Sequence, residues 1–169
     1  NWNDTVLVSG IITAMDGGVF TIDPALPASS TNFVSFQDAL DTMNYYGICS
    51  SIILDVASGT YNEQLKINNI PGSSSFATIT FRSATGNPAD VNLTYAPTSS
   101  TANYTVNMNG AQYVTFKQMT ISSTGTSYSR VFNYSSNASY NTIDSCIIKG
   151  EGGTTSTNNV LVFSDANNP

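Results

Sequence analysis

Three stretches of the sequence read alike: Ile79-Thr80-Phe81-Arg82, Val114-Thr115-Phe116-Lys117 and Asn141-Thr142-Ile143-Asp144. They align without gaps, at intervals of 35 and 27 residues. The last two also continue in parallel at the offset of 27, through Met119-Thr120-Ile121 and Cys146-Ile147-Ile148. A repeat of this length is typical of a chain built from stacked units, each of which buries its apolar face against the next.

Each repeat contains two or three short strands and no helix. A preceding strand recurs as Val106-Asn107-Met108, Val131-Phe132-Asn133-Tyr134 and Val160-Leu161-Val162-Phe163. Gly, Ser, Asn or Thr residues separate the strands, and helical periodicity is missing from Ile52 onward. Parallel strands need long crossovers unless the chain winds so that each turn's strands pair with those of the next turn. The pattern therefore predicts an all-β fold, a parallel β-helix with coils about 4.8 Å apart.

The alternation within the repeated stretches predicts which side chains stack on one another. The apolar residues form an inward column: Phe81, Phe116 and Ile143. The residues before them form an outward ladder: Thr80, Thr115 and Thr142. The residues after them form a second outward column: Arg82, Lys117 and Asp144. Because Lys117 and Asp144 fall on adjacent coils, we expect their opposite charges to attract.

One short α-helix is predicted over residues 35–46, near the start of the β-helix. Ser35 can cap it, with Asp38 at the third helical position. Its apolar residues recur at helical spacing: Phe36, Ala39, Leu40 and Met43. Gly47 is placed to end it. An open β-helix end exposes unpaired strand edges, and we expect this helix to cover the first one.

The chain divides into two parts. Residues 1–31 are predicted to hold N-terminal strands and a connector, and residues 32–169 the β-helix with its capping helix. The early strands are read at Val6-Leu7-Val8, Gly10-Ile11-Ile12 and Val19-Phe20-Thr21-Ile22. No second cap is evident, and a fresh strand begins near the end of the sequence. We therefore expect the β-helix to be truncated here and to continue in the intact protein.

Composition removes several classes of function. Ser, Thr and Asn make up 63 of the 169 residues, while only 9% are charged, with a net charge of -6. Nucleic acid is not an expected partner, since five basic side chains release few counterions. The absence of His excludes histidine-ligated zinc and His-dependent nucleophilic catalysis within this chain. No apolar run approaches the roughly 20 residues of a membrane helix.

Cofactors and metals are not expected either. Asp16-Gly17-Gly18 and Asp165-Ala166-Asn167-Asn168 offer oxygen ligands, but neither has the spacing of a calcium-binding loop. Both are typical of turns. The two cysteines, Cys49 and Cys146, are compatible with one disulfide or with two buried thiols.

The chain also resembles a known group of proteins. Its sequence is similar to the start of the right-handed β-helix region of large secreted surface proteins of Bacteroidetes-type bacteria. The similarity is found at Phe20-Thr21-Ile22-Asp23-Pro24, in residues 32–40 and in residues 56–64. The resemblance continues to about residue 163. The helix followed by Gly59-Thr60-Tyr61-Asn62-Glu63 is also similar to the opening of pectin methylesterases, which share the pectin-lyase-like fold. The resemblance implies a right-handed, pectin-lyase-like β-helix, and a type IX export route to the cell surface.

Enzymes of the pectin-lyase-like fold build their sites from carboxylates with an Arg or Lys, and hydrolysis of a polysaccharide needs two carboxylates at a fixed separation. The outward candidates here are Asp55, Glu63 and Asp144. Asp144 beside Lys117 is better explained as a surface ion pair, and Glu63 as a structural residue of the first coil. No catalytic residue is therefore assigned. An enzyme whose active site lies outside this chain stays open.

A ligand-binding face is the other possibility. Tyr113 and Tyr140 fall in register beside Thr115 and Thr142, and aromatic faces flanked by hydroxyls can hold sugar rings. Cross-strand Tyr and Thr pairs are also favourable in any sheet without a ligand.

We expect a non-catalytic, extracellular scaffold or surface-interaction segment of a larger secreted, adhesin-like protein. Its expected partners are polysaccharides or cell-surface glycans, and further domains of the same polypeptide. The alternative is a carbohydrate-binding module or the opening part of a polysaccharide-active enzyme.

Overall fold

The computed structural model describes residues 13–151 and 156–164. These residues form short strands in parallel sheets and one short helix, so the all-β class is confirmed. The elements near the N-terminus are β1 (Gly18–Ile22), β2 (Asn32–Phe33) and α1 (Phe36–Tyr46). The strands that follow are β3 (Ile52–Val56), β4 (Gly59–Asn62), β5 (Leu65–Ile67), β6 (Ile79–Ser83), β7 (Val91–Tyr95), β8 (Val106–Asn109), β9 (Val114–Lys117), β10 (Thr120–Ser123), β11 (Phe132–Ser135), β12 (Thr142–Asp144), β13 (Ile147–Lys149) and β14 (Val162–Ser164). The strands predicted at residues 6–8 and 10–12 lie outside the described residues.

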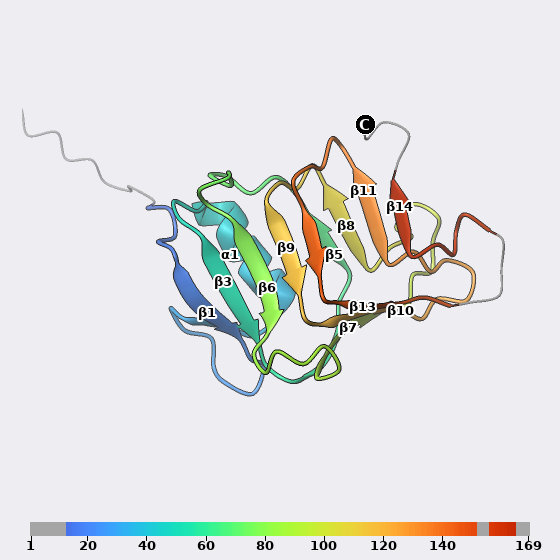
Figure 1. Cartoon of the computed structure of the whole chain (residues 1–169), viewed down its shortest axis with the longest axis horizontal. Coiled ribbons are helices and arrows are strands. Elements are labelled where there is room, and N and C mark those ends of the chain that lie inside the picture. The colour runs from blue at the N-terminus through green and yellow to red at the C-terminus, as the bar shows by residue number, and fades with distance from the viewer. Residues whose placement is uncertain (1–12, 152–155, 165–169) are drawn as a thin grey trace, which may run out of the picture.

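From β3 onward the chain visits three sheets in rotation. The first sheet has the order β12-β9-β6-β3-β1-β2, the second β13-β10-β7-β4 and the third β14-β11-β8-β5. All the strand pairs within these sheets are parallel. Figure 1 shows each sheet advancing from the end that holds β1 to the end that holds β14.

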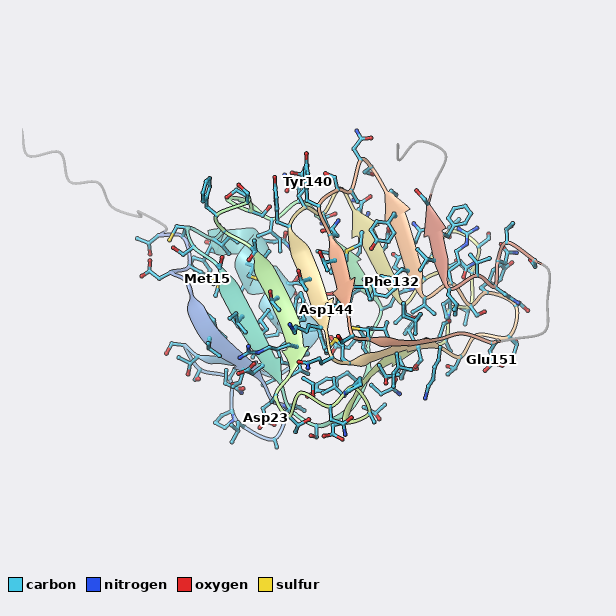
Figure 2. All side chains as sticks on the ribbon, in the orientation of Figure 1. Met15, Asp23, Phe132, Tyr140, Asp144 and Glu151 are labelled. Carbon is cyan, nitrogen blue, oxygen red and sulfur yellow. The ribbon has the colours of Figure 1, made fainter. Side chains whose placement is uncertain are left out.

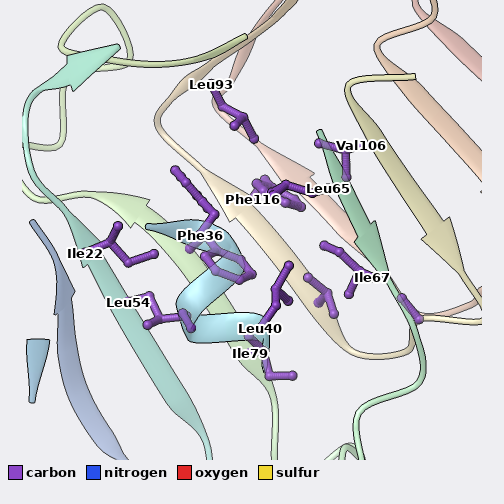
Figure 3. Packing of buried hydrophobic residues seen from close by; sticks show 14 of the residues in the cluster. Ile22, Phe36, Leu40, Leu54, Leu65, Ile67, Ile79, Leu93, Val106 and Phe116 are labelled. Carbon is purple, nitrogen blue, oxygen red and sulfur yellow. The ribbon is translucent and has the colours of Figure 1, made fainter. Parts of the chain in front are cut away.

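The predicted register of the first sheet is confirmed. Phe81 pairs with Phe116, and Phe116 with Ile143, so the inward column forms as expected. The rings of Phe81 and Phe116 stack with their centroids 5.2 Å apart, and Phe36 of α1 packs on Phe81 at 5.5 Å. Figure 3 shows Phe36 and Leu40 of the helix among apolar side chains of the strands, including Leu54, Ile79 and Phe116. The helix thus packs into the space that the sheets enclose.

In the third sheet, the strand register differs from the one expected when the repeated stretches are aligned on their first valines. Val106 pairs with Phe132 rather than with Val131, and Phe132 pairs with Val162 rather than with Leu161. Val131 lies just before β11, where its carbonyl accepts the N–H of Val106 at 2.9 Å. The strand therefore begins one residue later, and this brings Phe132 over Val106.

The helix has the boundaries and caps that the sequence predicted. The Ser35 hydroxyl accepts a hydrogen bond from the Asp38 N–H at 3.0 Å. Its buried face consists of Phe36, Ala39, Leu40 and Met43. Gly47 ends the helix at φ +71°, where its N–H donates to the Met43 carbonyl at 2.8 Å. This left-handed conformation favours glycine because it has no Cβ.

The two cysteines form no disulfide. Cys49 is exposed, so the alternative of a buried thiol does not hold for this residue, and its thiol donates to the Met15 carbonyl at 3.3 Å. Cys146 is half-buried beside the apolar interior, and burial raises the pKa of its thiol. Among the described residues, no helix has the length and apolar character needed to cross a membrane.

Candidate functional site

The two predicted tyrosines meet on the side of the first sheet where strands β9 and β12 begin, which we call the tyrosine edge. The rings of Tyr113 and Tyr140 are 4.9 Å apart between centroids and nearly parallel, with an interplanar angle of 6°. Both residues have a positive φ of 58°, which bulky side chains adopt only in special turns. Tyr140, labelled in Figure 2, is 71% exposed, whereas Tyr113 is half-buried.

Asn141 holds this turn in place. Its side-chain Oδ1 accepts the N–H of Val114 at 3.0 Å, and its Nδ2 donates to the Ala111 carbonyl at 2.7 Å. The side-chain amide of Asn141 therefore takes the place of backbone hydrogen-bonding groups for the segment before β9. It does so at the point where Tyr140 interrupts the extended backbone. Two hydrogen bonds to buried or half-buried backbone groups stabilise the strained conformation.

Thr115 and Thr142 are paired in register, as predicted, on the strands that follow the two tyrosines. The structure thus brings all four predicted ligand-binding residues to one edge. The stacked rings, however, cover each other's facing surfaces. A sugar ring has access to the free face of Tyr140, the ring edges and the adjacent hydroxyls, which is a smaller surface than two open aromatic faces.

Phe76 is a further exposed aromatic residue that the sequence analysis did not single out. Its side chain is 91% exposed, and its carbonyl accepts the Ser51 hydroxyl at 3.4 Å. Ser51 also bonds to Thr78, which precedes β6 as Tyr113 precedes β9. Phe76 therefore lies near the same edge. It falls in the connector before the repeated stretch, so the repeat gave no signal for it.

The three candidate carboxylates all have partners within the chain. Asp144 accepts from Lys117 at 2.9 Å, and this contact, with the Ser145 hydroxyl at 2.8 Å, holds the pKa of Asp144 below its ordinary value. Asp55 pairs with Arg82 at 2.6 Å. A general acid in hydrolysis needs a raised pKa instead.

Glu63 has a structural role that the sequence did not specify. Its Oε1 accepts the Phe36 N–H at 3.2 Å, and its Oε2 accepts the Gln37 N–H at 2.9 Å. These are two of the N–H groups that a helix leaves unpaired at its start, where a negative charge is also favourable. Glu63 therefore fastens the start of α1 to the segment that follows β4.

The outer face of the second sheet carries a shallow groove of about 340 Å³. Its polar lining consists of Thr60, Asn92, Thr120, Ser122 and Lys149. Thr120 donates to the Pro88 carbonyl at 2.8 Å and Ser122 to the Asn92 amide oxygen at 3.0 Å, so the two floor hydroxyls donate within the protein.

Acidic, cysteine and histidine side chains do not gather in groups of three or more within the described residues, as a metal site would require. Asp16 is exposed and lies just before β1, and the turn predicted at Asp165 lies outside the described residues. Comparisons with family models, with curated proteins and with solved structures find no match for this chain.

Proposed function

We propose that this chain is a segment of a right-handed, pectin-lyase-like β-helix that serves as a non-catalytic scaffold or interaction surface in a larger secreted or cell-surface protein. The observation that carries the proposal is the rotation of the strands through three parallel sheets. One end is covered by α1, and at the other end the described residues supply no further strand, so that it is called the open end. Right-handed connections between parallel strands are the rule, in about 98% of cases, which favours this handedness.

The open end supports a role within an extended molecule. Among the described residues, each of β12, β13 and β14 has a strand neighbour on one side only. Val162 is 50% exposed although its partner Phe132 is fully buried, and Ile143 and Ile148 are only partly covered. Apolar side chains and unpaired strand edges at one end suit the addition of another coil or of a further domain of the same polypeptide.

The lateral surface supports an extracellular role without dense charge. Polar ladders run across the coils, such as the Asn133 amide that donates to the Asn107 amide oxygen at 3.0 Å. Ser135 extends the same ladder with a hydroxyl bond to Asn107 at 3.0 Å. These polar side chains satisfy one another across neighbouring strands without charge, and each coil contacts only its neighbours, so the length of the molecule is easily extended. The resemblance to Bacteroidetes-type surface proteins favours secretion or the cell surface as the location.

An added coil tests the scaffold proposal. A copy of residues 109–135 would be joined after Ser164, because Asn109 and Ser135 are paired residues of successive coils. We expect slower amide hydrogen exchange in β12, β13 and β14 and a higher midpoint of thermal unfolding. A scrambled segment of the same composition is the control. Unchanged exchange in the three edge strands would contradict the proposal that this end extends.

Carbohydrate recognition is the second candidate, favoured by the exposure of Tyr140 beside Thr142. The test is a pull-down against insoluble and immobilised polysaccharides. Saturable binding lost in the Tyr113→Ala/Tyr140→Ala double variant, and kept in Tyr45→Ala on the helix, would support it. A panel without binding would remove this candidate and leave the scaffold. The opening part of a polysaccharide-active enzyme, with its site outside this chain, is the remaining alternative.

A further inference from the structure

A pocket of about 630 Å³ lies at the covered end, between α1, the start of β1 and the connector before β2. Its aromatic walls are Phe20, Phe33 and Tyr46. The rings of Phe20 and Phe33 are 5.9 Å apart, and Phe33 is almost fully buried. A concave, partly apolar space of this size is what small-molecule sites present, in the general range of about 300–1,000 Å³.

Two carboxylates, Asp16 and Asp38, also line this pocket. Asp38 accepts only a neutral donor, the Val34 N–H at 3.1 Å, and Asp16 accepts the thiol of Cys49 at 3.4 Å. The ion pairs among the described residues are those of Asp55 and Asp144. Neither pocket carboxylate therefore has a basic partner within the part of the chain that the structure describes.

Acidic and basic residues are also unevenly distributed along the sequence, with an excess of acidic residues in the part that forms the pocket. Residues 1–65 contain seven of the eleven acidic residues and none of the five basic ones, the first of which is Lys66. Tyr46 is the last residue of α1, whose final turn carries no basic side chain. The partial negative charge of the helix C-terminus lies at the Tyr46 end of the pocket, while Asp38 lies in the first turn of the same helix. The whole region favours a positively charged ligand.

We propose that this pocket binds a small organic cation, an ammonium group that carries apolar substituents. Aromatic side chains attract such a cation through the negative face of their rings, and the attraction is strongest where water is excluded. Asp16 and Asp38 supply the opposite charge, while Phe20, Phe33 and Tyr46 contact the apolar substituents. This inference is independent of the proposed scaffold role, since the pocket lies away from the open end and from the tyrosine edge.

Choline and 3,3-dimethylbutan-1-ol form a matched pair of probes, because they share a shape and differ in the charge of the head group. Binding would be followed by NMR, through the ring resonances of the aromatic residues in the full chain. We expect choline to give saturable shifts and the neutral alcohol to bind about tenfold more weakly or worse. Equal affinity for both probes, or no saturable shift with choline, would overturn the proposal.

Charge variants locate the site. Asp38→Asn and Asp16→Asn are each expected to weaken choline binding about threefold or more. Asp41→Asn on the same helix removes an equal charge outside the pocket lining, and it should weaken choline binding clearly less than either pocket variant. Since Asp38 also bonds to the backbone at the helix start, thermal unfolding would be followed for each variant, and Asp16→Asn keeps the test valid if Asp38→Asn is unstable. Choline affinity equal to that of the unmodified chain in both pocket variants would exclude this pocket.

Discussion

The two ends of the first sheet place inward side chains in the same register, yet they differ in how well these side chains are buried. At the covered end, the inward residues Leu54 and Phe81 are fully buried beneath α1 and their neighbouring coils. At the open end, Ile143 occupies the same column and is only partly covered, and Val162 is half exposed. The difference teaches that an inward position in these sheets is buried only when a neighbouring strand or the helix lies on both sides of it.

The largest effect is expected from emptying the middle of the stack. Phe116→Ala would leave a cavity between Phe81 and Ile143, where the side chain is fully buried. We expect a loss of about 3–5 kcal/mol in the free energy of unfolding. Ile143→Ala at the open end should cost clearly less, because its site is already partly hydrated. Denaturant titration of both variants measures the comparison, and equal losses would show that the open end is as well packed as the middle.

A smaller effect is expected from loosening the cap. Glu63→Ala removes the acceptor of two helix N–H groups, those of Phe36 and Gln37. The expected loss is about 1–2 kcal/mol. Glu151→Ala is the charge-matched control, an exposed residue towards the open end. If the two variants melt at the same temperature, Glu63 does not fasten the helix.

Alkaline pH should act on the covered end through Tyr61. Burial, followed by the nearby Asp23 and Glu63 charges, raises the pKa of Tyr61 to about 12, and its hydroxyl lies 2.8 Å from the Ala57 carbonyl. Since the unfolded pKa is about 10, the stability from this group is complete below pH 10 and is lost as the pH rises towards 12. Tyr61→Phe should cost about 1 kcal/mol at neutral pH.

The readout for Tyr61 is the difference in thermal midpoint between the unmodified chain and Tyr61→Phe. It should narrow between pH 10 and pH 12, because only the unmodified chain has this group to ionise. A difference that stays constant over this range would mean that the buried hydroxyl does not titrate with folding.

The smallest effect is expected at the open end, from the exposed pair of Lys117 and Asp144. Because the pKa of Asp144 is lowered in the folded chain, this contact stabilises the fold at pH values above the ordinary carboxyl pKa. The stabilisation is lost as the pH falls through the folded pKa. Asp144→Asn should shift the thermal midpoint only slightly at neutral pH, and the shift should vanish in high salt. A large, salt-independent shift would show that the pair is not a surface contact.

Much of the candidate site could be read from the repeat. The offset of 27 residues places Tyr113 against Tyr140 and Thr115 against Thr142, and both contacts are present. The orientation of the rings could not be read, because it depends on a positive φ at each tyrosine and on the amide of Asn141. These are properties of a turn, and alternation along a strand carries no information about them.

The sequence by itself determined the strand register of the first sheet, the inward column and the helix with its caps. It could do so because a fixed period sets which residues pair, and alternation sets which face they occupy. Only the tertiary structure decided that Glu63 binds the helix, that Asp55 pairs with Arg82, and that the aromatic pocket forms beside α1. Each of these contacts joins segments that are far apart in sequence or that belong to no repeat, so their meeting depends on how the strands and the helix pack in space.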